Sequence, residues 1–187
     1  MNRFALLALV FVSSLALAQA PTRVRGTITS LDGDVLSVKS RDGSDVKIHL
    51  TSDAGVATAK TTTLAELKGK AVGVTAHDKG GKMVAVEVHA LPPTVPLSHG
   101  PWDLQPGSTM TNATLEGVAG NNEITVDHKD GQKKIVVPAG TPIVAFVPGS
   151  RADLKPGEFI FTTARNEGGK LVSPRVAVSK DGVKPPQ

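Results

Sequence analysis

The residues best suited to chemistry in this chain gather in one proline-rich stretch, residues 92–111. His99, Asp103 and Met110 offer nitrogen, oxygen and sulfur donors, a set that suits a soft or borderline cation such as copper. Trp102, the single tryptophan, lies among them. Tryptophan is a large rigid anchor at protein interfaces, so Trp102 is a candidate for binding a partner. The alternative is that Trp102 packs between two modules and fixes their relative orientation.

Catalytic constellations are absent from the sequence. It contains no G-x-S-x-G element, phosphate loop or H-E-x-x-H motif. The acid–base neighbours Asp127 and His128 would point to opposite faces of a strand. With no cysteine, the chain has no disulfide, thiolate metal site or cysteine nucleophile. We therefore expect a protein that is not an enzyme and has no cofactor, and we assign no metal site beyond the candidates His99, Asp103 and Met110. A hydrolase without a recognisable motif is an alternative.

The amino-acid composition argues against binding to nucleic acid. Binding of single strands needs aromatic stacking platforms along a basic groove. The formal net charge is only +4, and aromatic residues make up 3% of the chain with no tyrosine. Two of the five phenylalanines, Phe4 and Phe11, lie in the first twenty residues. We therefore expect no binding to nucleic acid.

Residues 1–20 have the features of a secretory signal peptide. Arg3 supplies the basic start, and the apolar run from Phe4 to Ala18 is shorter than the roughly 20 residues that span a bilayer. Ala18 and Ala20 supply the small residues of a cleavage site. We expect cleavage after Ala20 and a periplasmic or secreted protein without a transmembrane segment. An uncleaved membrane anchor is the alternative.

The remaining sequence is typical of β-structure. Val46, Ile48 and Leu50 alternate with polar residues, and similar runs are separated by Asp-Gly and Gly-Gly pairs that favour tight turns. The alternation places His49 and His89 on the outer faces of strands, where we expect them to contact solvent.

The two halves of the chain resemble each other. Residues 24–28, 36–38, 66–69 and 80–84 correspond in order to residues 115–119, 124–126, 153–156 and 168–172. Each half predicts five strands with a short turn or helix after the third, which is the element order of an OB-type barrel. The predicted fold is all-β, with two tandem small five-stranded OB-like barrels at residues 21–91 and 112–180. A Pro-rich linker at 92–111 and a disordered tail at 181–187 complete the chain. Open β-sandwich modules are the alternative.

The same pattern resembles a family of uncharacterised secreted bacterial OB-like β-modules, here present in two copies. The residues that carry this resemblance are Val24, Gly26, Ile28, Leu36, Val38, Asp42, Gly43, Leu67, Lys68, Gly80, Gly81 and Val84. Residues 102–104 and 108–112 are similar to proteins labelled metal ABC transporter permease. A permease needs several transmembrane helices, so that label cannot describe this chain, and the resemblance implies at most an accessory of metal handling.

These observations lead to one expected function and one further alternative. We expect an exported, soluble, non-enzymatic binding or scaffold protein of the bacterial cell envelope, with an envelope protein as partner. The alternative is a periplasmic metal-binding accessory to metal transport or homeostasis. The oligomeric state is left open.

Overall fold

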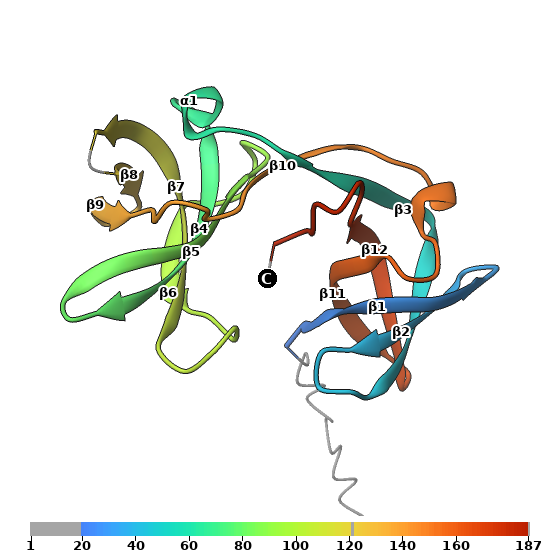
Figure 1. The fold of residues 1–187 in the computed structure, drawn as a ribbon. Coiled ribbons are helices and arrows are strands. Elements are labelled where there is room, and N and C mark those ends of the chain that lie inside the picture. The colour runs from blue at the N-terminus through green and yellow to red at the C-terminus, as the bar shows by residue number, and fades with distance from the viewer. Residues whose placement is uncertain (1–19, 121, 187) are drawn as a thin grey trace, which may run out of the picture.

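A computed structural model describes residues 20–120 and 122–186 (Figure 1). The predicted signal peptide, apart from Ala20, lies outside the described residues. Nearly all regular structure is β-strand, which confirms the all-β prediction. Within the described ranges, no helix is long and apolar enough to cross a membrane.

The strands lie close to the predicted positions, with two additions, β6 and β10. In chain order the elements are β1 (Thr22–Asp32), β2 (Val35–Ser40), β3 (Asp45–Thr61), α1 (Leu64–Leu67), β4 (Ala71–Lys79), β5 (Lys82–Ala90), β6 (Ser98–Pro101), β7 (Ser108–Ala119), β8 (Glu123–His128), β9 (Gly131–Val136), β10 (Ile143–Pro148), the 3-10 turn η1 (Arg151–Asp153), β11 (Phe159–Glu167) and β12 (Lys170–Val178).

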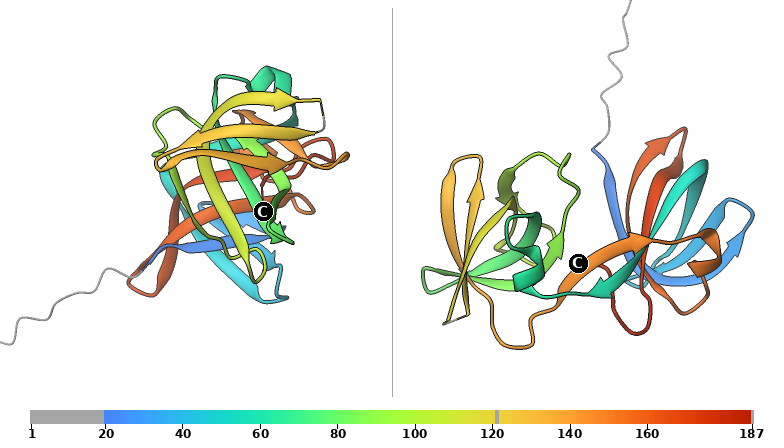
Figure 2. Two further views of the ribbon diagram at one scale, coloured as in Figure 1. Left: turned by 90° about the vertical axis from the view of Figure 1, so that its left-hand side faces the viewer. Right: turned by 90° about the horizontal axis from the view of Figure 1, so that it is seen from above.

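Ten strands form two closed five-stranded barrels (Figure 2). Around the first barrel the neighbours are β1, β2, β3, β12 and β11, and β3 runs parallel to β12 while the other neighbours are antiparallel. Around the second barrel they are β7, β8, β9, β5 and β4, with β9 parallel to β5. Both rings therefore have the same strand order, that of a small OB-type Greek-key barrel.

Each barrel combines strands from both halves of the chain. The first barrel takes β1, β2 and β3 from the first repeat and β11 and β12 from the second repeat. The second barrel takes β7, β8 and β9 from the second repeat and β4 and β5 from the first repeat. The repeats have thus exchanged their last two strands. The contiguous barrels expected at residues 21–91 and 112–180 are corrected to two interleaved barrels.

Two paired strands carry the chain between the barrels. The start of β3 pairs with β2, whereas its end, residues 57–61, pairs antiparallel with residues 144–148 of β10. β10 also begins a short parallel pairing with β5 through Ile143 and Val88. The two crossing segments form a ribbon that joins the barrels (Figure 1). Hydrogen bonds therefore continue from one barrel into the other.

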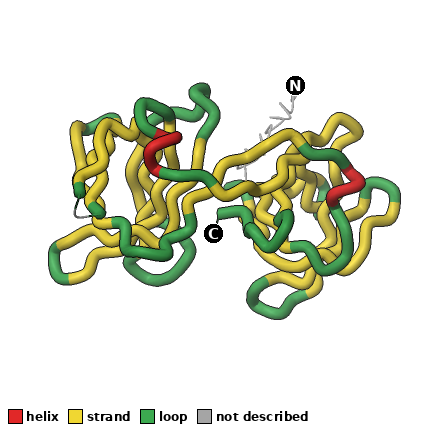
Figure 3. Tube along the Cα trace, turned by 45° about the horizontal axis from the view of Figure 1, so that its top comes forward, coloured by secondary structure: helices red, strands yellow, loops and turns green. Residues whose placement is uncertain are grey.

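Both barrels have a core drawn from the two repeats. Ile48 and Ile160 share the first core, and Val74 and Leu115 share the second. A short helical turn lies over each barrel (Figure 3). Since β-branched and leucine side chains alternate inward along the strands, each core is closed without disulfides.

Each helical turn sends a leucine into a barrel core. The side chain of Thr63 accepts a hydrogen bond of 3.2 Å from the backbone N–H of Glu66, and Leu67 then enters the second core. In the first barrel the equivalent position is η1, after which Leu154 enters the core.

Two further segments differ from expectation. The linker at 92–111 is only partly irregular, because residues 98–101 form β6 and pair with β7. The tail expected to be disordered at 181–187 is ordered over its described part. Lys180 and Val183 form a bridge, and Pro185 and Pro186 are buried.

Candidate functional site

The β6–β7 loop carries the tryptophan segment from the second barrel to the first. Trp102 N–H donates to the carbonyl of Ser108 (2.8 Å), and the Ser108 N–H donates to the carbonyl of Gln105 (3.0 Å). Gly107 has a φ of 79°, the left-handed conformation that closes the loop. These bonds hold residues 102–105 in a rigid turn that projects from a paired hairpin.

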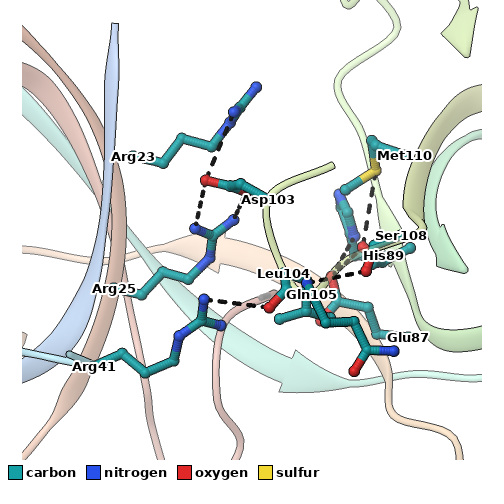
Figure 4. Close-up of polar contacts among 11 residues, drawn as sticks. Arg23, Arg25, Arg41, Glu87, His89, Asp103, Leu104, Gln105, Ser108 and Met110 are labelled. Atoms are coloured by element: carbon teal, nitrogen blue, oxygen red, sulfur yellow. Dashed lines mark hydrogen bonds and ion pairs between the residues drawn. The ribbon is translucent and has the colours of Figure 1, made fainter. Parts of the chain in front are cut away.

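At the tip of this loop, Asp103 pairs with two arginines of β1. The guanidinium of Arg25 donates two hydrogen bonds to the Asp103 carboxylate, at 2.8 and 3.1 Å, and Arg23 lies 3.7 Å from it (Figure 4). Arg25 is 5% exposed, whereas the Asp103 side chain is 44% exposed. Burial alone would raise the pKa of Asp103, but the hydrogen bond and charge of Arg25 and the charge of Arg23 outweigh it, so the pKa lies below its ordinary value. The carboxylate is therefore ionised at neutral pH and balances a buried cation.

Aromatic rings complete this contact. The guanidinium of Arg23 lies 4.0 Å from the centre of the Trp102 ring, and that of Arg25 lies 5.0 Å from the Phe161 ring. Such stacking suits arginine, because a planar delocalised cation can use its edge for a carboxylate and its face for a ring. We call Arg23, Arg25, Trp102, Asp103 and Phe161 the clasp. Its members come from β1, β11 and the β6–β7 loop, so it ties the first barrel to the second.

The structure does not bring the three metal candidates together. Asp103 is held in the clasp. His99 lies opposite Thr111 in the β6–β7 pairing and Met110 lies opposite Gly100, so alternation sends the His99 and Met110 side chains to opposite faces. Met110 sulfur instead lies 4.0 Å from the hydroxyl of Thr75. Within residues 20–120 and 122–186, no group of three or more histidine or acidic side chains is placed to hold a metal ion.

His99 joins a different, basic cluster at the end of the second barrel. Its Nδ1 lies 2.9 Å from the Thr111 hydroxyl, its Nε2 lies 3.1 Å from Lys133 Nζ, and its ring centre lies 5.6 Å from that of His128. Burial lowers the pKa of His99, and the charges of Lys133 and His128 lower it further, while Asp130 acts in the opposite direction. A neutral ring with its proton on Nδ1 satisfies both contacts.

Sequence reasoning missed a buried acid–base pair on β5. Glu87 and His89 are 5% and 7% exposed, with 3.6 Å between Glu87 Oε1 and His89 Nδ1. The Thr75 hydroxyl donates to Glu87 at 3.0 Å, and a Cβ placed on Gly73 would lie 2.3 Å from His89 Nε2. His89 is thus buried against glycine backbone, which corrects the expected solvent exposure. The alternation predicted that His89 lies on the outer face of its strand. It did not predict the burial of the ring, because the residues that cover it come from distant segments. One of them is Phe146 of β10, whose ring centre lies 6.5 Å from that of His89.

A depression of about 720 Å³ lies on the outer face of the first barrel. It spans β1, β2, β3, the turn between β11 and β12 and the start of β12, so both repeats contribute to it. Its lining combines hydroxyl and basic side chains with Asp45 and with apolar side chains, and includes Ser30, Ser37, Val46, Lys47, His49, Lys170 and Leu171. In OB-type barrels the face of the second and third strands and the loop between the fourth and fifth bind oligonucleotides and oligosaccharides. The depression occupies that position.

Trp102 lies half-buried against Arg23, between the barrels. This is the position expected from the alternative in which Trp102 packs between two modules.

Comparison of the chain with protein-family models, curated proteins and solved structures finds no match.

Proposed function

We propose that this protein is an exported, non-enzymatic binding or scaffold protein of the bacterial cell envelope. Its first barrel would bind an envelope protein through the depression over β2 and β3. The second barrel and the clasp would hold that face in one orientation. The proposal includes removal of residues 1–20, so that the exported chain begins at Pro21, which N-terminal sequencing of the protein from the cell envelope would test.

The depression is the observation that carries this proposal. Lys47 and Lys170 are exposed and come from different repeats, yet they line the same hollow. Serine and threonine hydroxyls can donate and accept hydrogen bonds, and lysines add donors with positive charge. Such a mixed lining favours a protein surface over stacked bases, because no phenylalanine, tyrosine or tryptophan is among the lining residues.

The charged groups between the barrels support a structural role for that region. The two terminal nitrogens of Arg25 donate to the Asp103 carboxylate, and the guanidinium of Arg23 lies over the Trp102 ring. Asp103 is therefore engaged as a counter-ion. This arrangement supports a binding frame over the metal-accessory role based on His99, Asp103 and Met110.

The test is a pull-down from envelope extract with the mature chain as bait. The depression variant carries Lys47→Glu with Lys170→Glu, and the matched control carries Lys68→Glu with Lys129→Glu, two exposed lysines on the second barrel. We expect an envelope protein that binds the wild type and the control but not the depression variant. Equal recovery by both variants, or no specific partner of the wild type, would contradict the proposal.

A further inference from the structure

The segment that follows β12 turns back towards the middle of the molecule. Ser179 N–H donates to the Phe159 carbonyl (2.8 Å), and the Ser179 hydroxyl accepts from the Phe159 N–H (2.7 Å). Lys180 and Val183 then exchange two backbone hydrogen bonds of 3.1 and 2.9 Å. The two residues between them have φ values of 51° and 79°, the left-handed pair of a tight reversal. The chain is thus fixed in direction before it reaches residue 184.

The next three residues lie between the barrels. Pro185 and Pro186 are buried. Lys184 is exposed, and its ammonium lies 5.4 Å from the Phe159 ring. In Figure 1, and in the view from above in Figure 2, the end of the described chain lies between the two barrels. The space between the barrels therefore already holds residues 184–186, a lysine followed by two prolines.

The chemistry of this segment suits such a site. A proline has no N–H, so burying two in succession leaves no backbone donor of theirs without a partner. Consecutive prolines also favour the polyproline II conformation before binding, which lowers the entropy lost on docking. Aromatic rings are the usual surface for such segments, and Phe159, beside Lys184, lies two residues from Phe161 of the clasp on the same face of β11.

We propose that the space between the barrels is a docking site for an extended Lys-Pro-Pro segment, which residues 184–186 occupy in cis. The partner is a protein that presents a basic residue followed by two prolines in an exposed segment, and it binds by displacing residues 184–186. This inference rests on the proposed role as a binding protein, but it uses a surface separate from the depression. The resident segment thereby regulates access to the site.

Displacement can begin at Lys184, because its side chain is exposed and a lysine over a ring contributes little at an exposed site. The tether supplies most of the occupancy, since a short connection raises the local concentration of the segment to about millimolar. A free peptide must compete with the tethered segment at that local concentration. Removal of the tail therefore allows the intrinsic affinity of the site for the peptide to be measured.

The experiment compares three proteins: the mature chain, the same chain ended after Asp181, and a full-length Pro185→Ser, Pro186→Ser variant. The probe is a synthetic peptide with the sequence of residues 182–187, Gly-Val-Lys-Pro-Pro-Gln. The control peptide has both prolines replaced by alanine. Binding is measured by calorimetry, and the contacted residues are mapped by NMR.

We expect both altered proteins to bind the probe at least about tenfold more tightly than the mature chain, because they lack the tethered competitor. The alanine peptide should bind more weakly, and the NMR shifts should centre on Phe159. Equal affinity for all three proteins, equal affinity for both peptides, or shifts centred on the depression would overturn the inference. Dimers of the mature chain that the peptide converts to monomers would also overturn it, since the tail would then be bound by a second copy. The serine variant keeps the test decisive if the shortened chain does not fold.

The outcome is separable from that of the proposed function. Lys47→Glu with Lys170→Glu alters the depression alone and should leave binding of the probe unchanged. A failed pull-down with intact probe binding would contradict the proposed envelope partner only. Failed probe binding with a successful pull-down would contradict only the docking site between the barrels.

Discussion

Arg25 donates two hydrogen bonds to Asp103 across 78 residues of sequence. The arginine lies on a strand of the first barrel and the aspartate on a loop of the second. Paired arginine and carboxylate fix both distance and plane, since two parallel N–H···O bonds form together. The relationship thus sets how the barrels face each other, in addition to the crossing strands that connect them.

Loss of the carboxylate should destabilise the protein. Asp103→Ala would leave the buried Arg25 guanidinium without its counter-ion, and we expect a loss of about 2 kcal/mol in the free energy of unfolding. The matched control is Asp45→Ala, which removes an exposed pair with Lys39 in which the side chains are 83% and 51% exposed. That change should cost less than about 1 kcal/mol. Urea denaturation measures both, and equal losses would show that the clasp contributes no more than a surface pair.

Acidification should weaken the fold through His99. The pKa of His99 is below its ordinary value of 6.5 in the folded state, so the unfolded chain binds more protons as pH falls below about 6.5. Stability from this group is therefore complete above that pH and decreases below it, until the folded state is protonated too. We expect His99→Gln to reduce the slope of unfolding free energy against pH between 8 and 5. An unchanged slope would contradict the role assigned to burial and to Lys133.

The ring of His89 lies so close to residue 73 that only glycine should fit there without strain. A methyl group at residue 73 would lie 2.3 Å from His89 Nε2, so Gly73→Ala should cost about 1–3 kcal/mol of stability. In a His89→Ala background the ring is absent, and the same change should cost much less. Gly55→Ala, where a Cβ meets nothing within 4 Å, is the control and should be nearly neutral. Thermal unfolding of the four proteins of this cycle gives the coupling, and a coupling near zero would show that the ring moves away freely.

The strands and turns of this fold were predictable because their signals are local. Val46, Ile48 and Leu50 follow the alternation of a half-buried strand, and the structure places Ile48 and Leu50 in the first core. Gly33 and Gly131 have positive φ in the turns that Asp-Gly pairs indicated. The repeat also predicted five strands for each half, in an order that both barrels retain.

The exchange of strands could not be predicted, because it depends on a choice between two similar partners. β4 and β11 occupy equivalent places in the repeats, and either would fit beside β1 by its alternation alone.

The burial of Arg25 and His89 was also missed because it depends on contacts between distant segments. Arg25 and His89 lie on outer faces, where a periodic pattern predicts solvent, and they are buried by segments far away in sequence. Trp102 was a candidate because it is the single tryptophan, but nothing in the sequence indicated that Arg23 would contact it.

Engineered disulfides test the exchanged topology directly, because the chain has no cysteine of its own. Ala71 of β4 lies opposite Thr114 of β7, so Ala71→Cys with Thr114→Cys should form a disulfide within one chain. Ser37→Cys with Lys47→Cys is the control, since that pair lies within one repeat and forms in either topology. Oxidised protein should run as a monomer in both cases on a non-reducing gel. A control that crosslinks while the first pair does not would contradict the exchange, because contiguous barrels separate β4 from β7. Crosslinking of the first pair only in dimers would mean that the strands are exchanged between two chains.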